Sequence, residues 1–520
     1  MRKWRRGIGA APLASLMAYK IFGCDGSVDD AIIVAAIDRA VVDGATVINM
    51  SLGADYGTAE SVESKAIDNA VRAGVVVVVS AGNAGPNPYL VGGPSTANRA
   101  LSVAALDTVE TYPGATMTFA STTLDGQNSN RSGSLPLTAD TVVLDDGDGG
   151  IGLGCDPADY TGTSGKIVVV LRGTCGRVEK LEYGADAGAA AVVMVNNASG
   201  LPPIEGVQQG ITIPFIGLDG DDAAAVMTAD GEGTTLAAGA DIVNPGFADA
   251  ADFSSGGPRA GDSGMKPDII APGVGVASAL VGSGTESVEL GGTSMAAPHV
   301  SGIAALVRSA HPSWSAAQVK AALMSSSSID DLAGYDPRIM GAGLVSARTA
   351  VAATAVATTK DGSNSLTFGF QSSTERIDET REFTIENLTN SPIRYNLSLE
   401  AAGSMLDAGV TITPSSVTVP ARGRKTVHVR IRMSADALAA LPGTSFWEIG
   451  PTELTTVRGV IVASASAPAT GVRVPFILVP KGESKIALED LHGAGGMVPK
   501  MSRRSFVTVR NSGVHGGSAD

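Results

Sequence analysis

One serine in the chain has the surroundings of a catalytic nucleophile. Residues 291–302 read Gly-Gly-Thr-Ser-Met-Ala-Ala-Pro-His-Val-Ser-Gly, and this run places Ser294 at the start of a predicted helix over 294–309. A hydroxyl at a helix N-terminus lies in a field that favours developing negative charge, which suits attack on a carbonyl carbon. An isolated Gly-Thr-Ser would normally indicate only a helix cap. The elbow motif Gly-x-Ser-x-Gly is excluded because Ala296 replaces its last glycine.

Two further sequence segments could provide residues that lie beside a reacting carbonyl group. Ser80-Ala81-Gly82-Asn83 follows an unbroken run of valines over 75–79, which is typical of a strand buried on both faces. An asparagine that ends a strand is ordinarily a turn residue, but its amide can also donate a hydrogen bond to an oxyanion. The run Ser51-Leu52-Gly53 ends a second predicted strand over 46–52 and by itself indicates only a turn.

Together, the three runs resemble motifs of the subtilisin-like serine peptidases (subtilases). The resemblance implies peptide hydrolysis through an acyl-enzyme on Ser294, with the amide of Asn83 donating to the oxyanion. It also implies that an extended protein or peptide substrate pairs with the backbone of the 46–52 strand. The residues that it places along the substrate are Ser51, Leu52 and Gly53 on one side and Ala81 and Gly82 on the other.

The chain offers no candidate for the catalytic base. In subtilases the catalytic Asp and then the catalytic His precede the Ser, whereas the first histidine here, His299, follows Ser294 by five residues. Five residues turn a helix by about 140°, so we expect His299 to face away and to be structural. The remaining histidines lie farther along the chain, and the early aspartates follow the wrong strand: His311, His428, His492, His515, Asp25, Asp29 and Asp30.

The missing base leaves two alternatives open. The first is a serine-type endopeptidase by family that lacks the first part of its peptidase domain and is inactive as this chain. The second is a non-catalytic scaffold or binding protein that uses the insert and the β-sandwich described below. The sequence upstream distinguishes them, because Asp and His motifs there would indicate a truncated enzyme.

The first 106 residues alternate strand and helix, which predicts right-handed crossovers and a parallel sheet. By resemblance, an Asp-bearing strand belongs between the predicted strands at 16–22 and 46–52. Since it is absent, we expect these two either to stay apart or to pair directly, and we expect low stability. Residues 1–18 mimic a signal peptide, but residues 9–22 resemble a segment inside the subtilase domain. The other elements predicted here are strands at 75–79 and 101–105 and helices at 31–42 and 59–73, with Ser27 and Asp30 at the start of the first helix.

Residues 107–247 contain a small α/β unit of their own. Its pattern resembles the protease-associated domain that some subtilases carry as an insert. Cys155 and Cys175 could form a disulfide, in which case their Cα atoms should lie within about 7 Å, or they could remain free thiols. The predicted elements are strands at 166–171, 190–195 and 213–218 and a helix at 178–187.

The peptidase core resumes over residues 248–355. A helix is predicted over 315–325, because Ser315 and Gln318 form a capping-box pattern. Gly256 occupies a position where subtilases of this architecture usually carry arginine, and we expect this departure to weaken the local packing.

The C-terminal part of the chain has an all-β pattern. Residues 356–483 predict a β-sandwich that resembles the fibronectin type III-like domains of some large subtilases, and residues 484–520 predict a further, incomplete domain. The expected fold class is therefore α/β: an incomplete subtilisin-like parallel-sheet core, an inserted small α/β domain and a C-terminal β-sandwich. The predicted strands lie at 381–386, 394–399, 410–412, 417–419, 426–433, 457–464 and 506–510.

Composition narrows the partners. The 520 residues carry a formal net charge of −15, which makes nucleic acid an unlikely partner. No apolar run reaches the roughly 18 residues that a membrane span needs. We expect no cofactor, and no loop shows a trustworthy calcium-ligand spacing. The resemblance implies an extracellular or cell-surface protein, although this chain carries no secretion signal.

Overall fold

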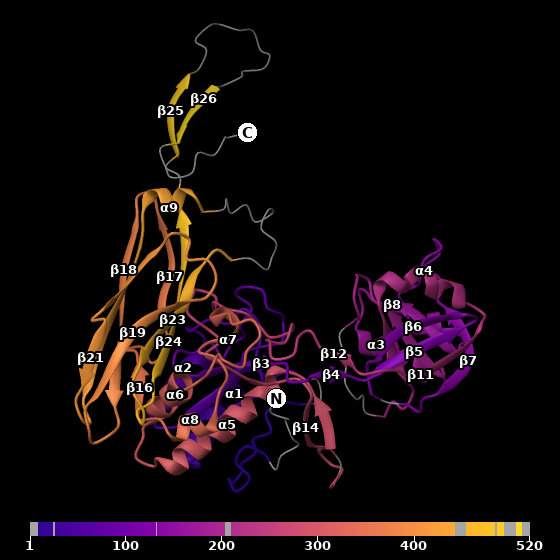
Figure 1. Cartoon of the computed structure of the whole chain (residues 1–520), viewed down its shortest axis with the longest axis horizontal. Helices are drawn as coiled ribbons and strands as arrows, with labels where there is room; N and C mark the ends of the chain where they lie inside the picture. The colour runs from indigo at the N-terminus through magenta and orange to yellow at the C-terminus, as the bar shows by residue number, and fades with distance from the viewer. Residues whose placement is uncertain are drawn as a thin grey trace. The chain divides into compact units, whose positions relative to one another are not determined.

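The computed structural model describes residues 9–23, 26–131, 133–202, 210–285, 287–441 and 454–483, with the backbone of 486–492 and 506–511. Cys24, Asp25, His515 and the side chain of His492 therefore lie outside the described residues. The chain divides into two compact units, and each is described by itself (Figure 1). The first consists of Met1–Leu106, Ala248–Gly273 and Gly292–Asp520, and the second of Asp107–Phe247 and Val274–Gly291.

The core of the first unit is a parallel sheet in the order β1-β2-β3-β13. Strand β2 is buried along its whole length, as its run of valines predicts. Helix α5 lies against all four strands, and α1 and α2 pack on each other. The elements of the core are α1 (Asp30–Val42), β1 (Val47–Met50), α2 (Val62–Arg72), β2 (Val76–Ser80), β3 (Leu101–Leu106), β13 (Ile269–Pro272), α5 (Thr293–Ala310), α6 (Ala316–Ser325), α7 (Pro337–Met340) and α8 (Ala347–Val351).

The sheet closes across a long interruption in the sequence. Strand β3 ends at Leu106, and its neighbour β13 begins at Ile269 and pairs in register with Val103. The parallel sheet predicted from strand–helix alternation is therefore confirmed, and it draws on both halves of the core.

The start of the chain differs from the sequence prediction. Residues 16–22 form no strand, so the prediction of a strand there is wrong, and β1 is the edge strand of the described sheet. Leu13 and Leu16 are almost fully exposed. A strand needs a partner for its ladder, and the described residues supply none at this edge. Helix α1 is capped by Asp29, whose carboxylate accepts from the Ala31 N–H, and not by Ser27, while Asp30 places its negative charge in the first turn as expected.

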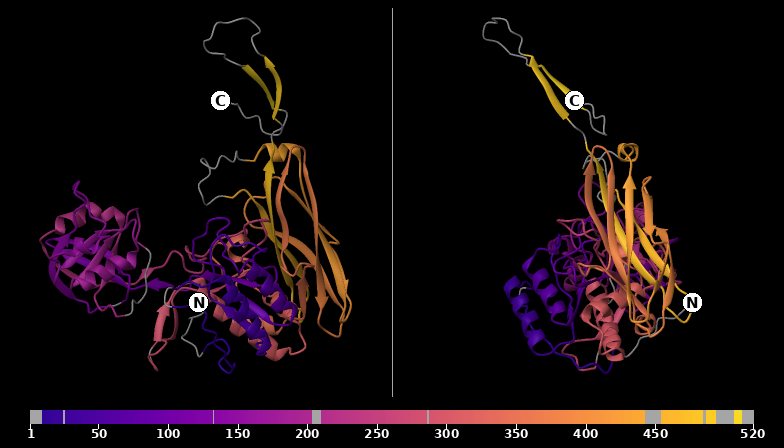
Figure 2. Two further views of the ribbon diagram at one scale, coloured as in Figure 1. Left: turned by 180° about the vertical axis from the view of Figure 1, so that it is seen from behind. Right: turned by 90° about the vertical axis from the view of Figure 1, so that its left-hand side faces the viewer.

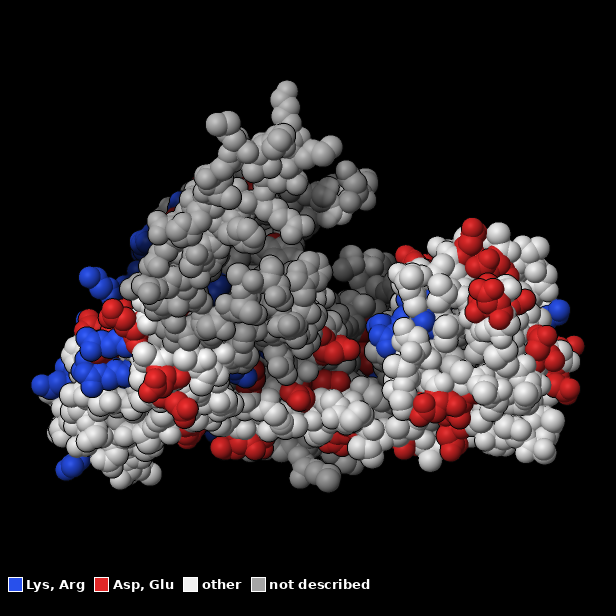
Figure 3. All heavy atoms as spheres, turned by 90° about the horizontal axis from the view of Figure 1, so that it is seen from above, with Lys and Arg blue, Asp and Glu red and all other residues white. Residues whose placement is uncertain are grey.

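The second unit is a closed barrel in the order β10-β6-β5-β11-β7-β8-β9. Its interior is apolar, and Figure 3 shows acidic side chains at several places on its surface. The barrel strands are β5 (Gly114–Phe119), β6 (Thr122–Asn128), β7 (Leu137–Val143), β8 (Ile167–Leu171), β9 (Ala191–Val195), β10 (Phe215–Leu218) and β11 (Gly233–Ala238). The other elements are α3 (Arg177–Asp186), α4 (Ala223–Val226), short 3-10 turns, and the pairs β4 (Thr111–Tyr112) with β12 (Ile242–Val243) and β14 (Val276–Ala279) with β15 (Ser287–Leu290).

Two features of this unit bear on the sequence predictions. Cys155 and Cys175 form a disulfide with a Cα–Cα distance of 5.7 Å, which confirms the pairing. The β14–β15 hairpin belongs to this unit, although residues 248–355 were all expected in the peptidase core.

The C-terminal part of the first unit consists of two sheets that share one apolar core, and we call it the two-sheet region. Figure 2 shows its long strands in orange and yellow. One sheet contains β16 (Ala355–Thr358), β18 (Ile377–Asn387), β22 (Arg424–Met433) and β20 (Gly409–Thr413). The other contains β17 (Leu366–Ser373), β24 (Val472–Gly482), β23 (Val457–Ser464), β19 (Ile393–Ala401) and β21 (Ser416–Val419), and α9 (Ala435–Ala439) follows β22.

The described chain ends in an antiparallel pair, β25 (Ile486–His492) and β26 (Phe506–Asn511). Among the described helices, none has both the length and the apolar composition that a bilayer crossing requires.

Candidate active site

The fold brings the candidate site residues to one edge of the core sheet. Ser51 follows β1, Asn83 follows β2 shortly after its end, and Ser294 lies in the first turn of α5. Because the strands are parallel, their carboxyl ends meet at the same edge, which is where α/β proteins place their sites. Three segments far apart in sequence therefore converge on the N-terminus of α5.

The amide group of Asn83 has a defined orientation. Its Oδ1 accepts hydrogen bonds from the backbone N–H of Thr293 (2.9 Å) and from the Thr293 hydroxyl (2.8 Å). An amide oxygen that accepts two such bonds leaves the NH₂ group on the opposite side. A Cβ built on Gly292 would lie 3.5 Å from Asn83 Nδ2, which places the amide donor beside the entry to α5.

Thr293 holds this arrangement and was not identified from the sequence. Its side chain is buried, and its hydroxyl also accepts a hydrogen bond from the Gly82 N–H at 3.2 Å. Gly82 itself has φ +111°, and a Cβ there would lie 2.7 Å from Ser255 Oγ. The turn that carries Asn83 therefore needs a glycine at 82 and a hydroxyl at 293.

Ser294 is half-buried, and its hydroxyl and its backbone N–H have no hydrogen-bond partner among the described residues. The free N–H is one of the orphan donors of the first helical turn. It is therefore a second possible oxyanion donor beside Asn83, a role that the sequence analysis did not assign.

Ser51 contacts the backbone of Ser294. Its hydroxyl donates to the carbonyl oxygen of Ser294 at 2.8 Å. In a regular helix this carbonyl would accept from residue 298, but Pro298 has no N–H to give. Ser51 thus supplies the missing donor, and Asn49 in turn donates to the Ser51 hydroxyl at 3.1 Å.

The expected substrate-lining residues lie around this contact. Strand β1 ends at Met50, so Leu52 and Gly53 extend beyond it, and the neighbouring Ala54 exchanges backbone hydrogen bonds with Gly93. Ala81 is fully buried and accepts from the Gly92 N–H. The structure places these residues next to Asn83 and Ser51 in the chain, and no substrate contact is observed for them.

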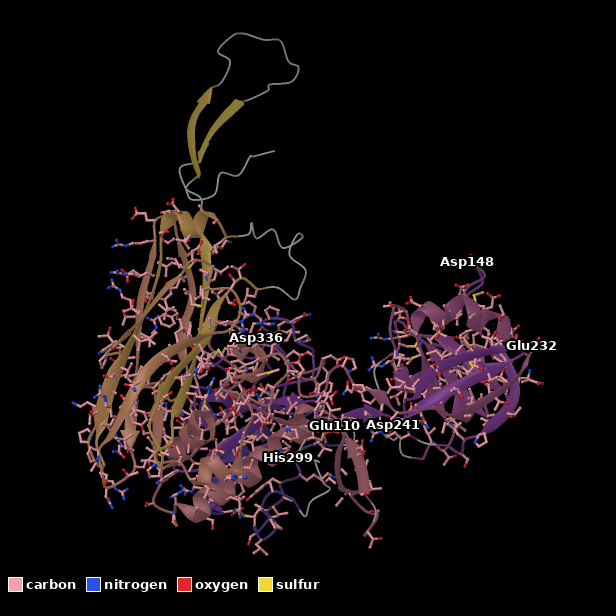
Figure 4. All side chains as sticks on the ribbon, viewed as in Figure 1. Glu110, Asp148, Glu232, Asp241, His299 and Asp336 are labelled. Carbon is pink, nitrogen blue, oxygen red and sulfur yellow. A yellow bond between two sulfur atoms is a disulfide. The ribbon has the colours of Figure 1, made fainter. Side chains whose placement is uncertain are left out.

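None of the described histidine side chains forms a hydrogen bond with Ser294. His299, labelled in Figure 4, bonds through Nδ1 to the Met295 carbonyl of its own helix at 2.8 Å. His311 bonds to the Val351 carbonyl and stacks on Trp314, and His428 lies in β22 beside Glu382. Within the described residues, Ser294 therefore has no histidine placed to act as a base.

The position of Gly256 is better packed than the sequence suggests. A Cβ there would lie 2.2 Å from the Pro86 carbonyl oxygen and 2.9 Å from Arg338 Nη1. The buried Arg338 guanidinium donates to the Pro86 and Gly257 carbonyls at 2.8 and 3.2 Å. The expectation of weakened packing is therefore wrong, because an arginine from elsewhere in the chain fills this space.

A buried ionic cluster supports the opposite end of the sheet. Asp268 Oδ2 lies 2.7 Å from Lys266 Nζ and 3.5 Å from Lys320 Nζ, and it also accepts from the Ser102 N–H. Burial lowers the pKa of Lys266 to about 7, and Lys320 adds to this shift, although Asp268 opposes it. Two lysines thus share one carboxylate away from solvent.

The described side chains include no group of three or more His, Cys, Asp or Glu residues arranged to hold a metal ion.

Comparison with known proteins defines the class. Residues 3–370 match the Subtilase family, Peptidase_S8, so the chain belongs to this family and is by family a serine peptidase. It is 34% identical over 454 residues to the minor extracellular protease Vpr of Bacillus subtilis. This match covers 84% of this chain and 54% of that protein.

More distant relatives come from plants and lactic acid bacteria. The chain is 33% identical over 338 residues to the subtilisin-like protease SBT1.4 of Arabidopsis thaliana, covering 61% of this chain and 43% of that protein. It is 32% identical over 340 residues to a PII-type proteinase of Lacticaseibacillus paracasei, covering 58% of this chain and 18% of that protein. The chain spans about half the length of the Bacillus relative and less of the other two.

Proposed function

We propose that this protein is a serine endopeptidase that cleaves peptide bonds through an acyl-enzyme on Ser294, with a base supplied from outside the described residues. The observation that carries the proposal is the orientation of Asn83. Its oxygen is occupied by Thr293, so its NH₂ group is free to donate at the N-terminus of α5. A donor fixed in advance stabilises developing charge without reorganisation.

In the proposed reaction, Ser294 Oγ attacks the scissile carbonyl carbon and the base takes the hydroxyl proton. The carbonyl oxygen becomes the oxyanion and accepts from Asn83 Nδ2 and the Ser294 N–H. The base then gives the proton to the leaving amine as the C–N bond breaks, and water hydrolyses the acyl-enzyme by the same steps. Every role except that of the base falls to a described residue of this chain.

The described residues alone should be almost inactive. No described histidine contacts Ser294, and loss of the histidine lowers kcat about a millionfold, a value measured in a subtilisin and taken over here. At the free edge of β1, an added strand would find unpaired backbone groups close to Ser51. A segment that pairs there is our candidate source of the base.

The substrate of this proposal is an extended peptide along Ser51–Gly53, paired as an added strand, with Ala81 and Gly82 on the opposite side. Glycine at position 53 suits this substrate path, because a Cβ there would lie 2.6 Å from the Gly93 carbonyl oxygen. The close approach of Gly93 therefore fixes the course of the backbone at Gly53. Backbone pairing accepts many sequences, which fits an endopeptidase.

We assign the barrel unit as a protease-associated domain and the two-sheet region as a fibronectin type III-like β-sandwich within a longer parent protein. The Cys155–Cys175 disulfide and the name of the Bacillus relative support an extracellular location. Nucleic acid is no partner in this proposal.

Labelling with a fluorophosphonate probe tests the function. The chain alone should label negligibly, and co-expression with the part of the Bacillus relative that lies outside its match to this chain should restore labelling. Ser294→Ala should abolish the restored signal, and Asn83→Ala should slow it about a hundredfold or more. Rapid labelling of the chain alone would show that it already contains a base. A bound fragment without labelling would favour a non-catalytic scaffold.

A further inference from the structure

A cavity of about 690 Å³ lies between the peptidase core and the two-sheet region, within the first unit. None of the candidate active-site residues lines it. Its walls come from α2, the loop before β3, the β16–β17 connection, β18 and β22. A volume in this range is typical of sites for small organic ligands.

The cavity wall carries cations that the protein does not neutralise. The guanidinium of Arg99 makes no hydrogen bond or ion pair with any described residue, and its Nε is buried. The guanidinium packs against Gly362, where a Cβ would lie 2.7 Å from Nη1, so its position is fixed by the backbone. The ammonium of Lys360 forms no ion pair within the described residues, and Arg72 donates only to Asn69.

Of the three carboxylates in the same wall, Asp68 and Asp361 accept hydrogen bonds from neighbouring residues, and Glu382 lies 3.5 Å from His428 Nδ1. Asp68 accepts from the Arg99 backbone N–H at 2.8 Å. Burial disfavours the charged form of Asp361, but hydrogen bonds from Thr359 and Ser363 outweigh it and hold the pKa below its usual value. These carboxylates therefore leave the guanidinium of Arg99 unpaired.

A buried hydroxyl also lacks a partner. Ser365 is 2% exposed and lines the cavity, and its Oγ has no hydrogen-bond partner. The Asn98 Oδ1 in the same wall is likewise buried without a partner. Buried polar atoms are satisfied in the great majority of native structures, so unpartnered ones beside a cavity point to a ligand.

We propose that this cavity binds a small organic anion through Arg99 and Lys360, with Ser365 donating a further hydrogen bond. The shared chemistry is that of an oxyanion, carboxylate or phosphate, because a guanidinium pairs with both in a two-pronged geometry. The volume exceeds what a single inorganic phosphate fills, so a polycarboxylate fits better. Since both parts of the unit contribute to the wall, the ligand would hold the core to the two-sheet region.

The test is titration of the full chain with citrate and, separately, with inorganic phosphate at pH 7 and constant ionic strength, by calorimetry and by thermal unfolding. We expect saturable binding of citrate, weaker binding of phosphate, and an unfolding midpoint that rises with citrate. Arg99→Gln and Lys360→Gln should each weaken citrate binding about tenfold or more. The matched controls Arg394→Gln and Lys425→Gln remove exposed cations of the two-sheet region and should leave it unchanged.

Two results would overturn the proposal. Absence of saturable binding of both anions would mean that water alone fills the cavity. Equal affinity in Arg99→Gln and the unchanged protein would mean that the anions bind elsewhere. Ser294→Ala should bind citrate as the unchanged protein does, so failure of the proposed peptidase function and failure of this site are separate outcomes.

Discussion

The buried cluster of Lys266, Asp268 and Lys320 should make the stability of the peptidase core depend on pH. Lys266 is fully buried, and burial lowers its pKa to about 7, although it lies 2.7 Å from Asp268. The pair does not restore the usual pKa because desolvation is the larger effect, and Lys320, 3.5 Å from the same oxygen, lowers the pKa of Lys266 further. In the unfolded chain the lysine returns to a pKa near 10.4.

The sign and size of the change in stability with pH follow from the folded and unfolded pKa values of Lys266. Between pH 7 and about 10 the unfolded chain holds a proton that the folded chain has released from Lys266, so the free energy of unfolding rises with pH. From pH 7.0 to 9.5 the rise is about 3 kcal/mol for this one group. Three tyrosines whose pKa values are raised by desolvation oppose it only near and above pH 10, when unfolded tyrosine ionises: Tyr160, Tyr335 and Tyr395.

The assay is urea unfolding followed by circular dichroism at four pH values from 7.0 to 9.5. The unchanged chain should gain stability with pH, and Lys266→Met should remove the part of that gain that Lys266 contributes; Lys320, whose pKa burial also lowers, contributes the rest. Lys65→Met removes an exposed lysine and is the control that should keep the full gain. A flat profile for the unchanged chain, or the same slope in both variants, would refute the reasoning.

Three further predictions concern the buried cations Arg338 and Lys180 and the packing at Gly256. Arg338→Ala should lower the free energy of unfolding by about 2–4 kcal/mol, because the buried Gly257 carbonyl and the partly buried Pro86 carbonyl lose their donor. Gly256→Arg should also destabilise the chain in urea unfolding, because its Cβ meets a backbone oxygen; a stable Gly256→Arg would contradict the packing described. Lys180 is buried with its ammonium 3.0 Å from Cys175 Sγ, where it would stabilise a thiolate after reduction. Lys180→Met should therefore need more dithiothreitol for half-reduction of the disulfide, read by mass after alkylation, and an unchanged midpoint would exclude this effect.

Elements with a strong local signal could be predicted from the sequence. The valine run became the fully buried β2, and the capping box of Ser315 and Gln318 begins α6 with both reciprocal hydrogen bonds. The two cysteines pair as expected. Each of these depends on residues close in sequence, or on a chemistry open to few partners.

Elements that depend on a distant partner were missed or wrongly placed. β17 and β24 pair in parallel across most of the two-sheet region, and the sequence analysis identified neither. Residues 16–22 have the composition of a strand and yet form none, because a strand exists only when another chain segment completes its hydrogen bonds. The composition of a segment shows that it could form a strand, and the topology decides whether a partner strand is present.

The candidate site shows the same division. Motif runs indicated Ser294 and Asn83 as candidates, but they could not show that Thr293 orients the amide of Asn83. Nor could they show that Ser51 donates to the carbonyl that Pro298 leaves without a helical partner. These contacts join residues more than two hundred positions apart, so no local pattern contains them.

Arg338 gives the clearest reason why a departure from a family motif should not be judged by position alone. The space beside Gly256 is bounded by backbone carbonyls of Pro86 and Gly257, and those oxygens need a donor whatever residue stands at 256. A guanidinium reaching in from α7 meets that need as well as one attached locally would. The carbonyl oxygens at this position need a hydrogen-bond donor, and the residue that provides it can come from another part of the chain. By the same reasoning, the hydroxyl of Ser294, which has no partner among the described residues, would need a base in the proposed reaction. That base can come from any segment that reaches it.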